Sequence, residues 1–301
     1  MTAVLRLTLL ASLLCPAMIT VPAMAQTPAV QAPAVQTPAV QSPAAEAAPA
    51  AASGPKQPCD VPAYLLSTES KLDKVSDAVK NRNKLDVLVI GSRSSSLAAA
   101  SGLPLTKALP NNPAPTSAPP DNAYPGRLQG MLRDRLPNVA INVTVDIQSK
   151  KTAEEVGADL PRLIGGQKPD LVIWQTGTVD AMRAIDPDDF RSAMDDGVKA
   201  LQAAGTDIIL MNLQYSPRTE TMISPAPYVD NMRVVAQQHD VPLFDRFAIM
   251  RTWHEDGDFD LFSPSPSTDL AKRVHECLAR ALTTFVIEAA RVNPNELKTQ
   301  R

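Results

Sequence analysis

Short apolar runs alternate with longer amphipathic stretches along residues 59–301. Five of the runs are rich in β-branched residues and are typical of buried strands: 85–90, 141–147, 171–174, 208–213 and 241–244. Five stretches repeat apolar positions with a helical period: 124–136, 152–164, 188–204, 229–238 and 270–291. Strands separated by helices predict one α/β domain with a doubly wound, five-stranded parallel sheet.

Two of the predicted helices begin with clear capping signals. Thr152 is followed three residues later by Glu155, which makes a capping box. Asp186 precedes Pro187, so an N-cap residue is followed by a proline in the first turn. Ligands of such sheets bind beyond the carboxyl ends of the strands, and the loops after the strands are therefore where a site is expected.

The first 25 residues are typical of a secretory signal peptide. Arg6 precedes an apolar run, and the small residues Ala23 and Ala25 predict cleavage after Ala25. The run is too short to span a bilayer as a stable helix. A retained N-terminal anchor and a lipoprotein formed through Cys15 are the alternatives. We expect a periplasmic or secreted protein with no transmembrane helix in the mature chain.

Residues 26–58 predict a disordered linker. They repeat Pro-Ala-Val-Gln and contain almost no charge and no aromatic residue, so they cannot bury enough apolar area to fold. The expected organisation is a signal peptide (1–25), a linker (26–58) and one folded domain (59–301). Within that domain the proline-rich segment 101–123 is expected to wall the site, to contact a partner or to form a surface insertion.

Charge and cysteine content narrow the possible functions. The chain has 29 Lys and Arg against 32 Asp and Glu, and this net charge of −3 does not suit a general nucleic-acid binder. No spacing of His, Cys and Asp matches a known metal-ligand set, so neither a metal nor a cofactor is expected. Cys59 and Cys277 would remain after cleavage, and they predict one disulfide in an oxidising compartment. Two buried free thiols are the alternative.

Several loop sequences resemble those of secreted bacterial SGNH (GDSL-type) hydrolases. The matching stretches occur in the family's order across about residues 59–290: VIGSRSSS (89–96), YPGRLQ (124–129), KPDLVIWQTGT (168–178), QYSP (214–217) and CLARAL (277–282). The resemblance implies a flavodoxin-like three-layer α/β/α fold. It also implies ester hydrolysis by a Ser nucleophile, an oxyanion hole that includes a Gly and an Asn, and a His base oriented by an Asp.

The sequence departs from the family at each of these positions. Arg93 stands where the nucleophile is expected, Lys150 replaces the Gly and Val179 replaces the Asn. Asp269 takes the place of the His, with Pro266 at the position of the orienting Asp. Losing a single one of these groups already lowers the rate by orders of magnitude. We therefore expect a degenerate, catalytically inactive protein.

Arg93, Lys150 and Asp269 are expected to converge in the altered cleft. They would bind an anionic group such as a uronate, a phosphate or a carboxylate, or Arg93 and Asp269 would fill the cleft with a salt bridge. A divergent hydrolase would need another nucleophile and base, for which Ser92, Ser94 and His254 are the candidates.

The sequence thus predicts a glycan- or partner-binding component of the cell envelope or of an exopolysaccharide system. Its partner would be an acidic or acylated polysaccharide or an envelope protein. The alternatives are a divergent O-acyl esterase acting on a surface polysaccharide and a purely structural assembly factor.

Overall fold

The computed structural model describes residues 59–97, 122–262 and 267–299; the predicted signal peptide, linker, Pro266 and most of segment 101–123 lie outside these ranges. Five strands form one parallel sheet in the order β2-β1-β3-β4-β5. They are β1 (Lys84–Gly91), β2 (Ala140–Ile147), β3 (Leu171–Gln175), β4 (Asp207–Met211) and β5 (Leu243–Phe244). The strand order reverses between β1 and β3, which confirms the predicted doubly wound, flavodoxin-like α/β fold.

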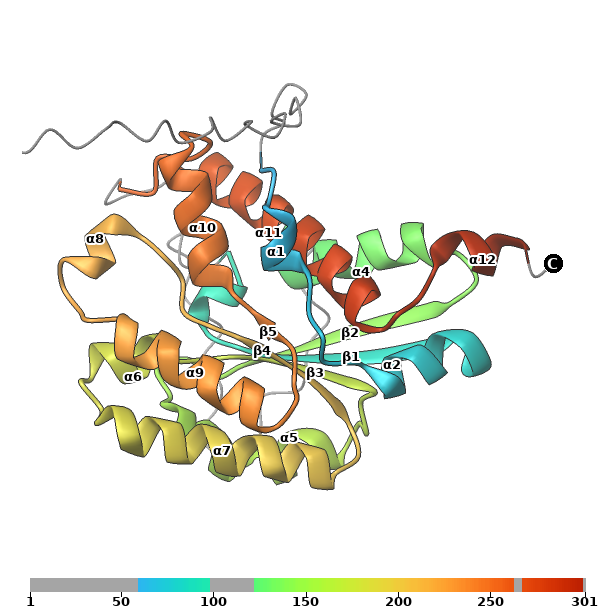
Figure 1. Ribbon diagram of the computed structural model, residues 1–301, viewed down its shortest axis with the longest axis horizontal. Coiled ribbons are helices and arrows are strands. Elements are labelled where there is room, and N and C mark those ends of the chain that lie inside the picture. Colours follow the sequence, from blue (N-terminus) through green and yellow to red (C-terminus); the bar gives the residue numbers. More distant parts are fainter. Residues whose placement is uncertain (1–58, 98–121, 263–266, 300–301) are drawn as a thin grey trace, which may run out of the picture. The chain divides into compact units, whose positions relative to one another are not determined.

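Helices cover both faces of this sheet (Figure 1). On one face α4 (Tyr124–Arg135) packs against α11 (Thr268–Ala289), and on the other α7 (Pro187–Ala203) lies between α5 (Ala153–Gly165) and α9 (Ala226–Gln238). The shorter helical segments are α1 (Ala63–Leu66), α2 (Asp73–Asp77), a π-helical turn (Ala78–Arg82), a 3₁₀ turn (Arg93–Ser95), α6 (Thr178–Met182), α8 (Pro217–Glu220), α10 (Arg246–Glu255) and α12 (Pro294–Thr299). Among the described helices, none combines the length and apolar character that a membrane crossing requires.

The predicted helix caps are present. Thr152 Oγ1 accepts a hydrogen bond from the Glu155 N–H at 3.3 Å, and Glu155 Oε2 accepts one from the Thr152 N–H at 2.8 Å. The Asp186 carboxylate accepts from the Asp188 N–H at 2.8 Å. These bonds satisfy N–H groups that have no partner within their own helices, and they set where α5 and α7 begin.

The centre of the sheet packs closely against α7. Trp174 on β3 is fully buried, and its ring lies over Gly197 of α7. A Cβ atom at position 197 would lie 2.4 Å from Trp174 Cη2, so the contact requires a glycine. This close approach fixes the depth at which α7 covers β3.

A disulfide joins Cys59 to Cys277 of α11, with the two Cα atoms 5.7 Å apart, and the predicted pairing is confirmed. The Cys59 N–H donates to the Asp258 carboxylate at 3.1 Å. Close by, Trp253 Nε1 donates to the Asp60 carbonyl at 3.2 Å. The start of the described chain is therefore held to α10 and α11.

The structure adds a helix that the sequence analysis does not predict, α10 after β5. Asp245 is its N-cap and accepts from the Ala248 N–H at 2.9 Å. Phe247, Met250 and Trp253 recur at helical spacing and are buried. Both features are ordinary helix signals, and they matter because α10 begins with a residue of the site described next.

Candidate functional site

The serine-rich turn after β1 lies where the strand order reverses. Gly91 ends the strand and Ser92 precedes the 3₁₀ turn. The Ser95 side chain folds back against Gly91, and a Cβ atom at position 91 would lie 2.2 Å from Ser95 Oγ. The Ser92 N–H donates to the same oxygen at 3.2 Å. A glycine at position 91 therefore lets the turn close tightly and present its hydroxyl groups at the sheet edge.

Gln175, the last residue of β3, organises these hydroxyl groups. Its amide Nε2 donates to Ser92 Oγ and to Ser94 Oγ, both at 2.9 Å. Its Oε1 accepts from Ser95 Oγ at 2.8 Å and from the Tyr124 hydroxyl at 3.1 Å. The amide thus uses both donors and both acceptor positions. Ser92 Oγ and Ser94 Oγ are 3.0 Å apart and also share a hydrogen bond.

Arg246, the first residue of α10, is buried beside this turn. Its Nη1 donates to Ser94 Oγ at 3.3 Å and its Nη2 to Gln214 Oε1 at 3.0 Å. Its Nε has no hydrogen-bond partner among the residues that the structure describes. Burial lowers the pKa of the guanidinium to about 10, and the side chain is therefore still cationic at neutral pH.

A chain of hydrogen bonds sets the position of Arg246. Asn212, after β4, donates through Nδ2 to Asp245 at 2.7 Å and accepts through Oδ1 from the Phe247 N–H at 2.8 Å. The Asp245 carboxylate also accepts from Arg233 Nη2 at 2.8 Å. The Asp245 carboxylate is thus paired with Arg233. The Arg246 side chain is buried and forms no ion pair with Asp245.

His275 of α11 approaches the same place and is buried. Its Nδ1 accepts a hydrogen bond from the backbone N–H of Tyr124, the first residue of α4, at 2.9 Å. A backbone N–H can only donate, so the neutral imidazole carries its hydrogen on Nε2. Burial, together with the charges of Arg246 and Arg127, lowers the pKa of His275 to about 3. The ring is therefore a neutral hydrogen-bond donor at physiological pH.

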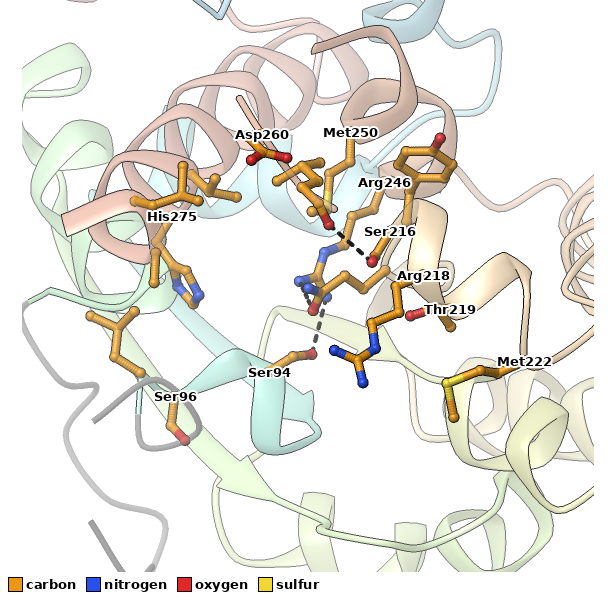
Figure 2. A pocket seen from close by; sticks show the side chains of 17 residues that line it. Ser94, Ser96, Ser216, Arg218, Thr219, Met222, Arg246, Met250, Asp260 and His275 are labelled. Atoms are coloured by element: carbon orange, nitrogen blue, oxygen red, sulfur yellow. Dashed lines mark hydrogen bonds between the residues drawn. The ribbon is translucent and has the colours of Figure 1, made fainter. Parts of the chain in front are cut away.

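Ser94, Arg246 and His275 line a cavity of about 490 Å³ (Figure 2). Ser94 comes from the turn after β1, Arg246 from α10 and His275 from α11. Much of the remaining lining is apolar and comes from Leu97, Met222, Met250, Leu261, Leu270 and Val274. Asp260 and Arg218 also line the cavity and are exposed to solvent. The cavity has a polar, positively charged floor and apolar walls.

An adjoining open cavity of about 580 Å³ contains three of the four positions that the family resemblance singles out. Arg93, Lys150 and Val179 line it. It shares Ser94, Gln214 and Thr219 with the cavity above. Loops after neighbouring parallel strands meet at one sheet edge, which explains why residues so distant in sequence lie together.

Lys150 has the backbone conformation expected of a glycine. Its φ angle is 62°, in the left-handed region that side chains disfavour. Its carbonyl accepts a hydrogen bond from Arg183 Nη2 at 2.7 Å, which helps to hold this conformation. The resemblance assigns this position to a glycine, and the chain keeps the left-handed backbone while adding a cationic side chain.

The fourth position, Asp269, does not converge with the other three. It lies in the first turn of α11 with its side chain 90% exposed, and its carboxylate is 3.8 Å from Lys272 Nζ. The helix begins at Thr268 after the N-cap Ser267, and this start turns position 269 toward solvent. The salt bridge between Arg93 and Asp269 is absent: Arg93 forms no ion pair within the described ranges.

The candidates for an alternative catalytic pair are not brought together either. Ser92 and Ser94 lie in the Gln175 network, but His254 Nδ1 lies 3.2 Å from the Phe259 carbonyl and lines neither of the two cavities. Within the described residues, no group of three His, Cys, Asp or Glu side chains is arranged to hold a metal ion.

Sequence reasoning missed Gln175, Arg246 and His275. Gln175 is a polar residue directly after an apolar strand, at the edge where a site was expected, so a signal existed. Arg246 and His275 carry no such signal, because their positions follow from how α10 and α11 pack on the sheet.

Two solved structures with the same fold are described as hydrolases. A catalytic mutant of Axe2, an acetylxylan esterase from Geobacillus stearothermophilus, superposes with a TM-score of 0.51 at 21% identity, over 67% of this chain and 94% of that one. LAE5, an alpha/beta hydrolase enzyme from the metagenome of Lake Arreo, Spain, gives a TM-score of 0.50 at 19% identity, over 68% and 96%. At these identities the likeness concerns the fold.

None of the curated proteins matches the chain significantly. A family model does match it: the model of the Non-GDSL lipase-like family covers residues 58–292. This range contains every residue of the two cavities.

Proposed function

Since the chain belongs to the Non-GDSL lipase-like family and has the fold of SGNH-type hydrolases, we propose that it uses this fold to bind a ligand without hydrolysing an ester. The ligand would be an acidic or acylated polysaccharide or an envelope protein, held at the carboxyl edge of the sheet. Arg93 and Lys150 are the proposed contacts in the open cavity, and Asp269 has no part in this proposal.

The state of the Ser94 oxygen carries the proposal. A serine nucleophile needs a free lone pair and a base that takes its proton. Ser94 Oγ instead accepts hydrogen bonds from an amide and from a guanidinium, Gln175 Nε2 and Arg246 Nη1. Both donors withdraw electron density from the oxygen. Its one hydroxyl neighbour, Ser92 Oγ, is no base.

His275 does not supply the missing base. It is the histidine that lines the cavity, but its accepting nitrogen, Nδ1, is already bonded to the Tyr124 N–H. Its Nε2 carries a hydrogen and faces an environment that lowers the pKa of the ring to about 3. Accepting a proton from Ser94 would create a second buried cation close to Arg246.

The second candidate function is a divergent ester hydrolase. It is favoured by the two neighbouring hydroxyls, Ser92 and Ser94, after β1 in a fold shared with the acetylxylan esterase Axe2. The two functions differ in whether either hydroxyl reacts with an ester.

One set of variants tests both functions. We expect the purified chain to turn over p-nitrophenyl acetate no faster than buffer. We also expect it to bind an acidic polysaccharide in a pull-down or calorimetric assay. Arg93→Ala and Lys150→Gly should weaken that binding, because each removes a cation from the open cavity. The glycine variant suits the left-handed backbone at position 150, so it should fold well.

The matched controls are an arginine and a serine on the exposed side of α7. Arg191→Gln should bind like the unaltered chain, because Arg191 lies away from both cavities. Ester turnover that disappears in Ser94→Ala but persists in Ser192→Ala would overturn the proposal and establish the hydrolase. Unaltered polysaccharide binding by both cavity variants would remove Arg93 and Lys150 from the ligand site.

We place this function in the periplasm or outside the cell. The Cys59–Cys277 disulfide supports an oxidising compartment, and residues 1–25 have the composition of a signal peptide.

A further inference from the structure

Among the residues that the structure describes, Arg246 is a buried cation without a counter-ion. It is 1% exposed, and it forms no ion pair with any residue in the described ranges. Within the part of the chain that the structure describes, its hydrogen bonds go to two neutral groups, Ser94 and Gln214, and its Nε has no partner. Enclosing a guanidinium in this way costs free energy, and its field is screened little by the surrounding protein. A fold keeps such a charge most readily where a negative group completes the site.

The polar groups around Arg246 offer hydrogens to the cavity. His275 has its hydrogen on Nε2, because Nδ1 is taken by Tyr124. Gln214 accepts from Arg246 through Oε1, which leaves its amide hydrogens as donors. The carboxylate that lines the cavity, Asp260, is exposed to solvent and forms no ion pair with Arg246. The floor therefore suits a hydrogen-bond acceptor with negative charge.

The walls suit an apolar body. Met250, Leu261 and Val274 face the cavity together with Leu97, Met222 and Leu270. A volume of about 490 Å³ is within the range of cavities that hold small organic molecules. Two arginines, Arg246 and Arg218, and one carboxylate, Asp260, line the cavity, and this balance of one positive charge favours a carboxylate over a phosphate that is close to doubly charged at neutral pH.

We propose that this cavity binds the carboxylate head of an amphiphilic organic acid. The head lies over Arg246 and His275, and the apolar body packs against Met250, Leu261 and Val274. This inference goes beyond the proposed function, because it concerns the cavity lined by Arg246 and His275 and not the open cavity that contains Arg93 and Lys150. The acid is either a free molecule or an acidic group carried by a larger one, and both present the same carboxylate.

Calorimetric titration of the purified full chain tests the proposal with four probes. Hexanoate has the charge and an apolar body, hexanamide has the body alone, galacturonate has the charge on a sugar, and inorganic phosphate is the dianion. We expect hexanoate to bind and hexanamide not to bind. Galacturonate and phosphate should bind more weakly than hexanoate. Tighter binding of galacturonate than of hexanoate would contradict the proposal that the ligand has an apolar body. It would identify an acidic sugar as the source of the carboxylate.

Two substitutions locate the head group. Arg246→Met should weaken hexanoate binding by about tenfold or more, because a hydrogen-bonded charge pair is lost. His275→Asn keeps an acceptor for the Tyr124 N–H and removes the Nε2 donor, so it should weaken binding by roughly threefold to tenfold. If Arg246→Met fails to fold, as judged by circular dichroism, His275→Asn decides. Arg191→Gln is the control and should bind as the unaltered chain does.

Equal affinity for hexanamide and hexanoate, tighter binding of phosphate, or full affinity in His275→Asn would each overturn the proposal. These results are distinguishable from failure of the proposed function, whose readouts are ester turnover and polysaccharide binding that depends on Arg93 and Lys150. Turnover that depends on Ser94 would refute a non-catalytic role while leaving carboxylate binding measurable. If the chain neither hydrolyses the ester nor binds hexanoate, the proposal of carboxylate binding is refuted and the non-catalytic role is not.

Discussion

The imidazole of His275 is fixed by a single hydrogen bond. The N–H that it accepts belongs to the first turn of α4, where no carbonyl of the same helix can act as partner. The ring therefore caps a helix and is locked into one tautomer. A histidine in a cavity beside serines resembles a catalytic base in composition, but this contact gives it the role of a donor.

Asp207 shows the same dependence on surroundings at the amino end of the sheet. Its carboxylate accepts from the Val75 N–H at 3.0 Å, and burial raises its pKa from 3.8 to about 6. The folded chain thus holds this proton more tightly than the unfolded chain does. The stability that this group contributes is complete below the unfolded pKa of 3.8 and is lost as the pH rises through about 6.

Asp207→Asn should therefore stabilise the protein at neutral pH. The amide keeps an oxygen for Val75 and carries no charge. We expect a gain in the free energy of unfolding of about 1–3 kcal/mol at pH 7 that vanishes near pH 3.5, measured by urea denaturation. A gain of the same size at both pH values would show that the charge of Asp207 is not its cause.

Among the elements, α5 and α7 offer a matched pair of helical glycines. Gly197 of α7 lies against the Trp174 ring, whereas the nearest atom to a Cβ at Gly157 of α5 is the Ala193 carbonyl oxygen at 4.0 Å. Alanine is favoured over glycine inside a helix by about 1 kcal/mol. The two positions therefore separate helix propensity from packing.

We expect Gly157→Ala to raise the free energy of unfolding by up to about 1 kcal/mol. Gly197→Ala should lower it by about 1–3 kcal/mol, because the new methyl group forces the indole and α7 apart. Chemical denaturation measures both, and near-ultraviolet circular dichroism reports the displaced Trp174. Equal effects of the two substitutions would show that α7 shifts without cost.

The apolar pattern predicted the sheet well and its last strand less well. The structure extends each of the predicted strands 85–90, 141–147 and 171–174 by one or two residues. In the predicted run 241–244 only Leu243–Phe244 is a strand. Pro242 lacks an N–H and contributes its carbonyl to the Leu210 N–H, which shortens the ladder.

The site was predictable only as far as loop positions follow from strand order. Arg93, Lys150 and Val179 each follow a strand, and they share one cavity. The direction of the Asp269 side chain depends on the residue at which α11 begins, and the alignment of motifs did not determine that residue. Arg246 and His275 reach the site through helix packing, which has no counterpart in local sequence patterns.

At the scale of the whole molecule, the disulfide closes nearly the entire folded chain into one loop. Cys59 and Cys277 are 218 residues apart in sequence. In the chain-entropy account, closing a loop of this length stabilises the folded state by about 5 kcal/mol, because the unfolded chain loses conformational freedom. The stability of the domain should therefore depend strongly on the redox environment.

We expect protein isolated from the periplasm to begin at Gln26 and to lack free thiols, as measured by mass spectrometry with and without reduction. Reduction should lower the free energy of unfolding by about 3–5 kcal/mol in urea denaturation. The double variant Cys59→Ser with Cys277→Ser should have the same free energy of unfolding as the reduced protein, and adding a reductant should not change it. Indifference of the unaltered chain to reduction would contradict this role of the disulfide.

The same bond decides how the molecule responds to tension. All five strands lie between Cys59 and Cys277, inside the covalent loop. A pull applied between the two chain ends passes through the sulfur atoms and bypasses the sheet and the turn that carries Ser94. Only residues before Cys59 and after Cys277 can be drawn out. A domain built in this way keeps its site under mechanical load for as long as the bond remains oxidised.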